Sequence, residues 1–240
     1  MTHSPAVSAP VTNELSVMQD MLSMDSLNHI LELGCGNARL AQELLTRYPN
    51  CRYIGMEVDE RQHALNVTTP QVGMTFLIGG AQAIDLPDQC CDLVLMLKSL
   101  HHVPIPEMDK ALQEISRVLR PDGHLYVSEP VYAGALNDVV RLYNDEGVVR
   151  AAAQAALDRA LAPRESIWRQ VAERRFEMPV HFKDFNDFEL RMMRPTYADH
   201  RLDETKIEQV RTTFLPHCGT DGAHFTRPMH VRLFQRKAGS

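Results

Sequence analysis

The segment Ile30–Gly36 constrains the fold of this chain more than any other part of its sequence. A short apolar run leads through Glu32 to two glycines one residue apart, Gly34 and Gly36. Such a run, bounded by glycines, is typical of a buried parallel strand, and glycine permits a sharp turn and a close approach of a ligand to the backbone. Apolar residues at helical spacing follow at Leu40, Ala41, Leu44, Leu45 and Tyr48. The order strand, glycine turn, helix indicates a nucleotide-binding βα unit.

The spacing of the glycines argues against a dinucleotide site. The pattern G-x-G-x-x-G requires a third glycine, and Arg39 occupies that position. An NAD-dependent oxidoreductase is therefore a disfavoured alternative. A second alternative is a glycine turn that only closes a structural loop.

The acid-x-Gly-x-Gly pattern that starts at Glu32 resembles the first motif of class I S-adenosylmethionine-dependent methyltransferases, with Ala38 in place of the third glycine. Three further segments resemble the small-molecule branch of this family, often called type 11: Gly79–Asp92, Asp92–Val103 and Glu114–Gly123. The motifs stand in the order and spacing of the family over residues 29–130. The resemblance implies a Rossmann-like, doubly wound α/β sheet of seven mostly parallel strands, the last antiparallel.

Strand and helix signals alternate as far as Pro130, which favours right-handed crossovers and a parallel sheet. The strand candidates are Arg52–Glu57, Met74–Ile78, Leu93–Leu97 and His124–Glu129, and a helix precedes Pro121. Residues 134–176 are rich in alanine and charge without a strand signal, so we expect a helical insertion at about 131–176 that covers the acceptor pocket. Later candidates are a strand at 177–182, helices at 184–194 and 203–215, and a closing strand, His230–Gln235. Residues 1–12 are expected to be flexible and 13–240 to form one domain whose first helix packs on the core.

The resemblance implies where S-adenosylmethionine would bind. Glu32, Gly34, Cys35 and Gly36 form the loop, and Glu57, about twenty residues later, would accept hydrogen bonds from the ribose hydroxyls. Val58 would pack on the adenine. The family has an aspartate for the adenine amino group where this chain has Gly80, so the backbone of Ala81 or the side chain of Gln82 would replace it. Lys98 completes the predicted cofactor site and borders the acceptor side.

Methyl transfer from a sulfonium needs alignment in a dry site, and a general base only when the acceptor has a proton to lose. Lys98, His101 and His102 follow the fourth predicted strand, and Glu129 and Tyr132 lie at the end of the fifth. We therefore name His101 and Glu129 as candidate catalytic residues. The competing interpretation makes the two histidines a strand cap and a packed side chain.

Charge and composition bound the partners of the chain. Its 25 basic and 31 acidic side chains give a net charge of −6, which disfavours nucleic acid as a partner. The family resemblance implies a small-molecule acceptor as the partner. An RNA or protein methyltransferase and a non-catalytic scaffold that binds the cofactor remain alternatives, and a homodimer is left open.

We expect a cytoplasmic protein, because the five cysteines are scattered without C-x-x-C and the sequence shows no membrane span or signal segment. None of the eleven histidines shows H-x-x-x-H or H-E-x-x-H spacing, so no metal site is expected.

Overall fold

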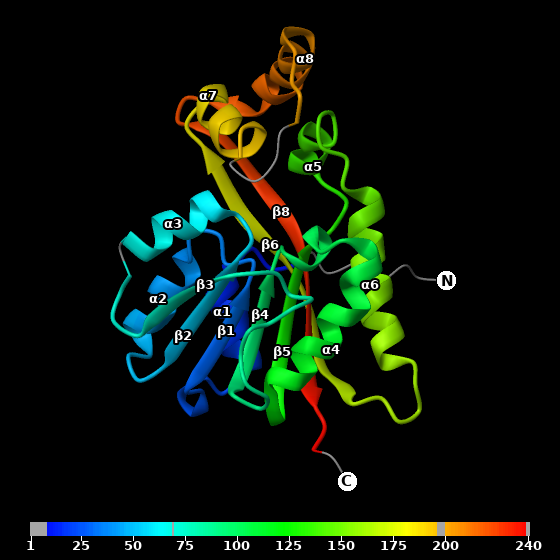
Figure 1. The fold of residues 1–240 in the computed structure, drawn as a ribbon. Helices are drawn as coiled ribbons and strands as arrows, with labels where there is room; N and C mark the ends of the chain where they lie inside the picture. Colours follow the sequence, from blue (N-terminus) through cyan, green and yellow to red (C-terminus); the bar gives the residue numbers. More distant parts are fainter. Residues whose placement is uncertain (1–8, 69, 196–199, 239–240) are drawn as a thin grey trace.

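The computed structural model describes residues 9–68, 70–195 and 200–238 (Figure 1). A single sheet in the order β3-β2-β1-β4-β5-β8-β6 forms its centre. The strands are β1 (His29–Leu33), β2 (Arg52–Glu57), β3 (Met74–Ile78), β4 (Cys91–Leu97), β5 (Leu119–Pro130), β6 (Trp168–Phe182), β7 (Cys218–Gly219) and β8 (Gly222–Arg236). The five strands predicted within residues 29–130 are all present.

Strand directions agree with the expected topology. Strands β1 to β5 pair in parallel, whereas β8 runs antiparallel to both β5 and β6. The two-residue β7 pairs only with the start of β8. Because the carboxyl ends of β1 to β5 meet at one edge, the loops that follow these strands are brought together there.

Helices lie on both faces of the sheet, as in a doubly wound fold. Val94 and Met96 of β4 belong to a core with α4 and α6, whereas Leu93 and Leu95 face a core with α1 and α2, as strand alternation requires. The helices are α1 (Glu14–Met21), α2 (Arg39–Arg47), α3 (Glu60–Thr68), α4 (Met108–Val118), α5 (Ala135–Val140), α6 (Gly147–Leu161), α7 (Phe185–Phe188) and α8 (Glu204–Phe214). Short 3-10 turns are η1 (Met24–Ser26), η2 (Leu100–His102), η3 (Ile105–Glu107) and η5 (Leu215–His217), and η4 (Glu189–Met193) is a π-helix. No helix within the described ranges is long and apolar enough to cross a membrane.

The helical prediction for residues 168–176 is wrong, because these residues form the first half of β6. Along them, half-buried or buried positions alternate with exposed ones, from Trp168 to Phe176. Polar side chains such as Gln170 and Arg174 occupy several of the inward positions, so burial alternates while hydrophobicity does not. Charged side chains are common on strands at a sheet edge, and β6 is such a strand. The helices predicted before it are present as α5 and α6.

Beyond the end of β5, strands β6 and β8 continue as a two-stranded ribbon that carries α7 and α8, with α5 beside it (Figure 1). We call the ribbon (177–182 and 222–228), α5, α7, η4 and α8 the cap. Its core is a third apolar cluster, rich in phenylalanine and separate from the two cores of the sheet. The cap stands above the carboxyl ends of the parallel strands. It thus comes from segments far apart in the sequence rather than from residues 131–176 alone.

The first described residues are attached to the sheet. Val11 forms a parallel bridge with Glu177 of β6, and two backbone hydrogen bonds flank it. Helix α1 follows and packs Val17 and Met18 into the core, as expected. Residues 1–8 of the segment expected to be flexible lie outside the described residues.

Candidate functional site

The loop after β1 has the backbone geometry that its two glycines suggest. Gly34 and Gly36 adopt φ angles of 71° and 51°, and Ala38 also has a left-handed backbone, at 51°. A Cβ on Gly34 would lie 2.7 Å from the Cβ of Ser99, whereas one on Gly36 would meet nothing within 4 Å. Gly34 is therefore required both by its backbone angle and by the close approach of Ser99, which follows β4.

Hydrogen bonds from the rest of the domain hold this loop in place. The backbone N–H groups of Gly34 and Cys35 donate to the carbonyl of Met56 at 2.8 and 3.1 Å. Asn66 of α3 donates to the Gly36 carbonyl at 2.7 Å. The Cys35 thiol points into the core, where burial raises its pKa to about 12. Cys35 therefore serves the shape of the loop, while Gly34 and Gly36 present its backbone.

Glu57 lies at the end of β2, beside the loop. One of its carboxylate oxygens accepts the backbone N–H of Gly36 at 2.8 Å. The other accepts those of Val58 and Asp59 at 2.8 and 3.0 Å. Three backbone donors thus orient a carboxylate that still has acceptor capacity for hydroxyl groups. The side chain of Val58 is 64% exposed next to it, as expected of a residue that would pack on a ligand.

Glu32 is a buried carboxyl group directly below the loop. The Tyr53 hydroxyl donates to it at 2.7 Å. Burial raises the pKa of Glu32 to about 7, although this hydrogen bond and the charge of Lys98 act to lower it. Glu32 is therefore poised to titrate near neutral pH, and a cation beside it would favour its ionised form.

Gln82 occupies the space beside Gly80. A Cβ on Gly80 would lie 2.6 Å from the Gln82 side-chain oxygen, so the amide folds over the position where the family has an aspartate. Ala81 is buried between them. Of the two replacements considered for the missing acid, the Gln82 amide is the group that lies in its place.

Lys98 and Ser99 join the ends of β4 and β5 to the loop. Lys98 has a left-handed backbone, with φ 58°, and its N–H donates to the Ser128 carbonyl at 2.7 Å. The Ser99 hydroxyl donates to the Leu33 carbonyl at 2.7 Å. The predicted cofactor residues from β1, β2, β4 and the loop after β3 therefore lie along one edge of the sheet.

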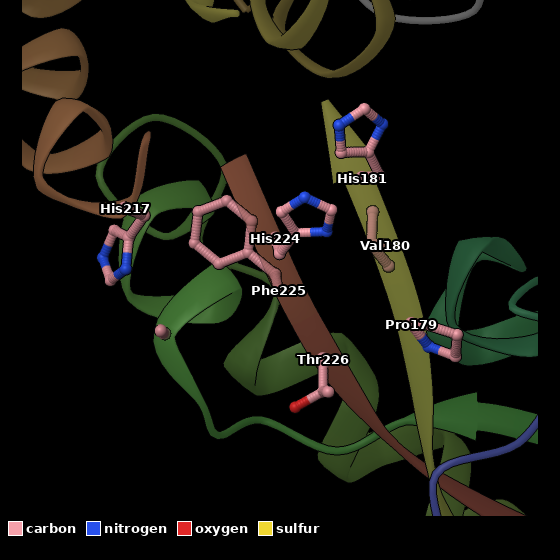
Figure 2. Close-up of a pocket in the computed structure, with 8 residues that line it drawn as sticks. Pro179, Val180, His181, His217, His224, Phe225 and Thr226 are labelled. Carbon is pink, nitrogen blue, oxygen red and sulfur yellow. The ribbon is translucent and has the colours of Figure 1, made fainter. Parts of the chain in front are cut away.

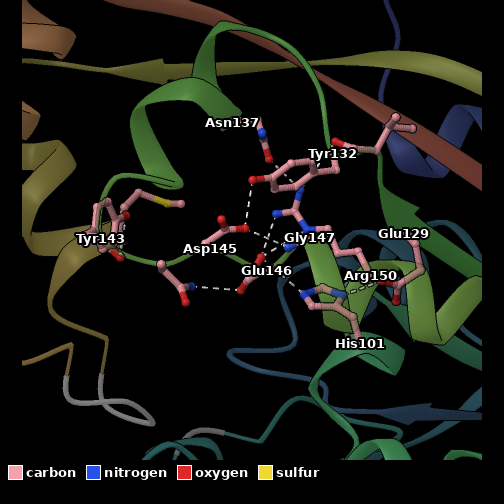
Figure 3. Close-up of polar contacts among 12 residues, drawn as sticks. His101, Glu129, Tyr132, Asn137, Tyr143, Asp145, Glu146, Gly147 and Arg150 are labelled. Atoms are coloured by element: carbon pink, nitrogen blue, oxygen red, sulfur yellow. Dashed lines mark hydrogen bonds and ion pairs between the residues drawn. The ribbon is translucent and has the colours of Figure 1, made fainter.

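The two predicted catalytic residues contact each other. His101 Nδ1 forms a hydrogen bond with Glu129, whose second oxygen accepts the N–H of Leu100 at 3.0 Å (Figure 3). His101 is 3% exposed and Glu129 2%. Adjacent parallel strands bring the pair together across 28 positions of sequence. The imidazole is oriented by a buried carboxylate, an arrangement that can hold a proton or a ligand at Nε2.

The N-terminal end of helix α6, with Glu146 directly before its first residue, contributes residues that the sequence did not single out. Glu146 approaches His101 Nε2 to 3.7 Å and pairs with Arg150 at 2.6 Å. Burial alone would raise the pKa of Glu146, but the charges of His101 and Arg150 lower it. Tyr132, a predicted acceptor-side residue, donates to Asp145 at 2.8 Å in the same network (Figure 3). The only sign of the Glu146–Arg150 contact in the sequence is an acid four positions before an arginine, the spacing of an ion pair on a helix.

Glu14 is a second buried acid that the sequence did not reveal. It accepts hydrogen bonds from Tyr126 at 2.7 Å and Ser128 at 3.0 Å, and so ties α1 to β5. Its position at the start of an amphipathic helix gives no sign of burial. Glu14 is a structural link between the N-terminal helix and the functional edge of the sheet.

A separate hollow of about 530 Å³ opens in the cap between the ribbon, α5 and η5 (Figure 2). His181, His217 and His224 line it, beside Phe225. Asp221 orients two of these rings, since His181 bonds its carbonyl at 2.8 Å and His224 its carboxylate at 3.0 Å. None of the predicted site residues borders this hollow.

Comparison with known proteins agrees with this geometry. A methyltransferase domain family matches residues 31–127, which hold the glycine loop, Glu57 and His101. A fatty-acid O-methyltransferase from Mycolicibacterium smegmatis is 31% identical over 107 residues, 42% of this chain and 36% of that protein. A demethylmenaquinone methyltransferase from Chlamydia trachomatis is 26% identical over 117 residues, 48% of this chain and 50% of that protein. The chain thus aligns with half or less of the length of these relatives.

Similarity of fold extends further than similarity of sequence. The structure of a putative methyltransferase from Bacillus halodurans superposes with a TM-score of 0.63 over 94% of this chain and 99% of that one, at 12% identity. At this identity the superposition concerns the fold alone. It extends well beyond residues 31–127 of this chain.

Proposed function

The chain contains a class I, S-adenosylmethionine-dependent methyltransferase domain, and from this we propose that it transfers a methyl group from S-adenosylmethionine to a small-molecule acceptor. The observation that carries the proposal is the carboxylate of Glu57, which three backbone N–H groups orient beside the glycine loop. An acid fixed at this point suits the two hydroxyls of a ribose.

The residues along the sheet edge suit the separate groups of the cofactor. Glu57 would bind the ribose, Val58 would pack on the adenine, and the Gln82 amide would bind the adenine edge. Glu32 and Lys98 offer opposite charges for the ammonium and carboxylate of the methionine end. The bare backbone of Gly34 and Gly36 permits close approach of the ligand. When bound, the sulfonium supplies an activated methyl group.

His101 is the residue best placed to take a proton from the acceptor. Glu129 holds its Nδ1, so Nε2 is the atom available for a proton. Glu146 lies 3.7 Å from Nε2, so an acceptor that uses this atom would be bound beside the Glu146 carboxylate. For an acceptor without a proton to lose, the pair would only shape and dry the site.

A small-molecule acceptor is supported by charge and by similarity. The net charge of −6 suits a phosphate-rich acceptor poorly. The named relatives act, according to their names, on a fatty acid and on demethylmenaquinone. The cap stands above the carboxyl edge of the sheet, and we assign acceptor selection to it (Figure 1).

Calorimetry with S-adenosylmethionine, S-adenosylhomocysteine and NADH tests the proposal on the wild type and on Glu57→Ala. We expect micromolar binding of the two sulfur ligands, weakened about tenfold or more by the loss of a charged bidentate contact. Glu60→Ala, an exposed acid three residues away, is the matched control and should bind as the wild type does. Failure of both sulfur ligands to bind would overturn the proposal, and binding of NADH alone would favour an oxidoreductase. Tight, salt-dependent binding of tRNA would favour an RNA substrate.

A further inference from the structure

Three metal-ligating side chains converge where η2 meets α6. One ligand atom from each of His101, His102 and Glu146 lies within 4.8 Å of the other two. His101 Nε2 is 3.7 Å from a Glu146 oxygen, and the two imidazole rings are 4.1 Å apart at their centroids. We propose that these residues bind one divalent cation of the zinc type.

The ligand set suits such a cation. Two imidazoles and one carboxylate form a three-ligand set of the kind that catalytic zinc sites use, with a fourth position open to water or substrate. In a tetrahedral shell with bonds of 2.0–2.2 Å, neighbouring ligand atoms lie about 3.4 Å apart. The separation of His101 and Glu146 therefore needs to shorten by only a few tenths of an ångström.

Outer contacts orient two of the ligands. Glu129 bonds His101 Nδ1, which leaves Nε2 to face Glu146. Asn144 and Arg150 donate to the two oxygens of Glu146 at 2.9 and 2.6 Å. Metal-binding imidazoles and carboxylates usually carry such partners, which fix their orientation, and the carboxylate of Glu129 also raises the basicity of the His101 imidazole.

The local charge also permits a cation. Glu129, Glu146 and Asp145 provide three carboxylates, against the guanidinium of Arg150 (Figure 3). Arg150 is held independently by Asn137 at 2.9 Å, so it does not depend on Glu146 alone. Imidazoles bind a metal in their neutral form, so these charges would leave a negative balance around the bound cation.

The exposure of the ligands gives the site one open side. His101 is buried, Glu146 is largely buried and His102 is exposed. Since η2 directly follows Lys98 and Ser99, the cation would lie on the acceptor side of the sheet edge. An acceptor hydroxyl in the fourth position would become more acidic and would lose its proton to solvent, because His101 Nε2 would then bind the cation. A cation and a proton exclude each other at Nε2.

The test uses metal-stripped protein titrated with Zn²⁺ against a chelating dye, and with Co²⁺ followed by visible absorption. We expect one equivalent of tightly bound Zn²⁺ and the intense bands of four-coordinate Co²⁺. His102→Ala removes an exposed ligand and should weaken Zn²⁺ binding at least tenfold and abolish the bands. The double variant His181→Ala/His224→Ala removes two clustered imidazoles elsewhere, in the cap, and should bind Zn²⁺ as the wild type does.

Three results would overturn the site: no stoichiometric binding, unchanged binding by His102→Ala, or loss of binding in the cap double variant. Circular dichroism melting of each variant checks its folding. Calorimetry with S-adenosylhomocysteine on the same metal-stripped protein tests the cofactor site independently. A missing cation would therefore be distinguished from a failure of the methyltransferase proposal.

Discussion

The Glu57 carboxylate accepts the backbone N–H of Gly36 at 2.8 Å, so the acid that ends β2 and the second glycine of the loop after β1 form one unit. The two residues lie 21 positions apart, yet each fixes the other. A ligand that binds the Glu57 carboxylate therefore binds beside a loop that already has its final conformation. Such preorganisation lowers the entropy that binding must overcome.

Gly34 and Gly36 should respond differently to the same substitution. Gly34→Ala combines a left-handed backbone with a Cβ only 2.7 Å from Ser99, whereas Gly36→Ala meets no neighbour. We expect the backbone alone to reduce the free energy of unfolding by about 1–2 kcal/mol at Gly36. Overlap with Ser99 should add about 1–3 kcal/mol at Gly34. Urea unfolding measures both, and equal losses would contradict the close packing of Gly34 on Ser99.

The buried Glu32 should make stability fall as pH rises. Its pKa is raised from 4.5 to about 7, so the folded state binds more protons than the unfolded state between these values. The stabilisation is fully present below pH 4.5 and is lost as the pH rises through 7. Glu32→Gln keeps the hydrogen bond from Tyr53 and removes the charge. Relative to the wild type, the variant should gain about 2–3 kcal/mol in unfolding free energy between pH 5 and pH 8.

Urea titrations of both proteins at the two pH values provide the measurement. A difference between wild type and variant that stays constant with pH would show that Glu32 does not titrate in this range. We also predict that Glu32 releases a proton when S-adenosylmethionine binds near pH 7. The cationic ammonium would favour the ionised carboxylate.

Arg150 should matter more than a second arginine on the same helix. Arg150 and Glu146 are both largely buried, whereas Arg159 forms an exposed pair with Asp109. Arg150→Met leaves the Glu146 charge without its partner and should cost about 3 kcal/mol of unfolding free energy. Arg159→Met should cost less than about 1 kcal/mol.

A double-mutant cycle separates the ion pair from packing. Adding Glu146→Gln to Arg150→Met should recover part of the loss, because no uncompensated carboxylate remains. If the losses of unfolding free energy in the two single variants add up to the loss in the double variant, Arg150 and Glu146 do not act as a unit. The experiment also tests whether the charge of Glu146 holds the start of α6 against His101.

The sequence was sufficient to predict the residues at the carboxyl edge of the sheet. His101 and Glu129 could be placed together because each follows one of two adjacent parallel strands. Glu57 could be placed because its spacing from the glycine loop is set by one βαβ crossover. These relationships depend on the topology of the sheet, which the family resemblance implies, whereas periodicity locates only the individual strands.

What the sequence did not reveal depends on tertiary packing. The half-buried polar side chains of β6, such as Arg174, conceal its alternation. Glu146 reaches His101 only because α6 packs across the end of β4, and the spacing of residues within α6 does not determine that crossing. The cap combines α5, which ends at Val140, with segments that begin 37 or more positions later, at 177, and no local pattern connects them.

The phenylalanine cluster should make the cap a separable unit of stability. The Phe214 ring lies 4.8–6.0 Å, between centroids, from those of Phe182, Phe185, Phe188 and Phe225. Phe214→Ala removes this centre and should destabilise the cap by about 3–5 kcal/mol. None of the predicted cofactor residues lies in the cap, so S-adenosylhomocysteine binding should stay within about twofold of the wild type. Amide hydrogen exchange of 177–194 and 204–228 measures the stability of the cap, and calorimetry measures cofactor binding.

Leu190→Ala, at an exposed position of the cap, is the control and should change neither the exchange rates of the cap nor the binding of S-adenosylhomocysteine. Loss of cofactor binding together with cap protection would mean that the cap shapes the cofactor site and not only the acceptor side.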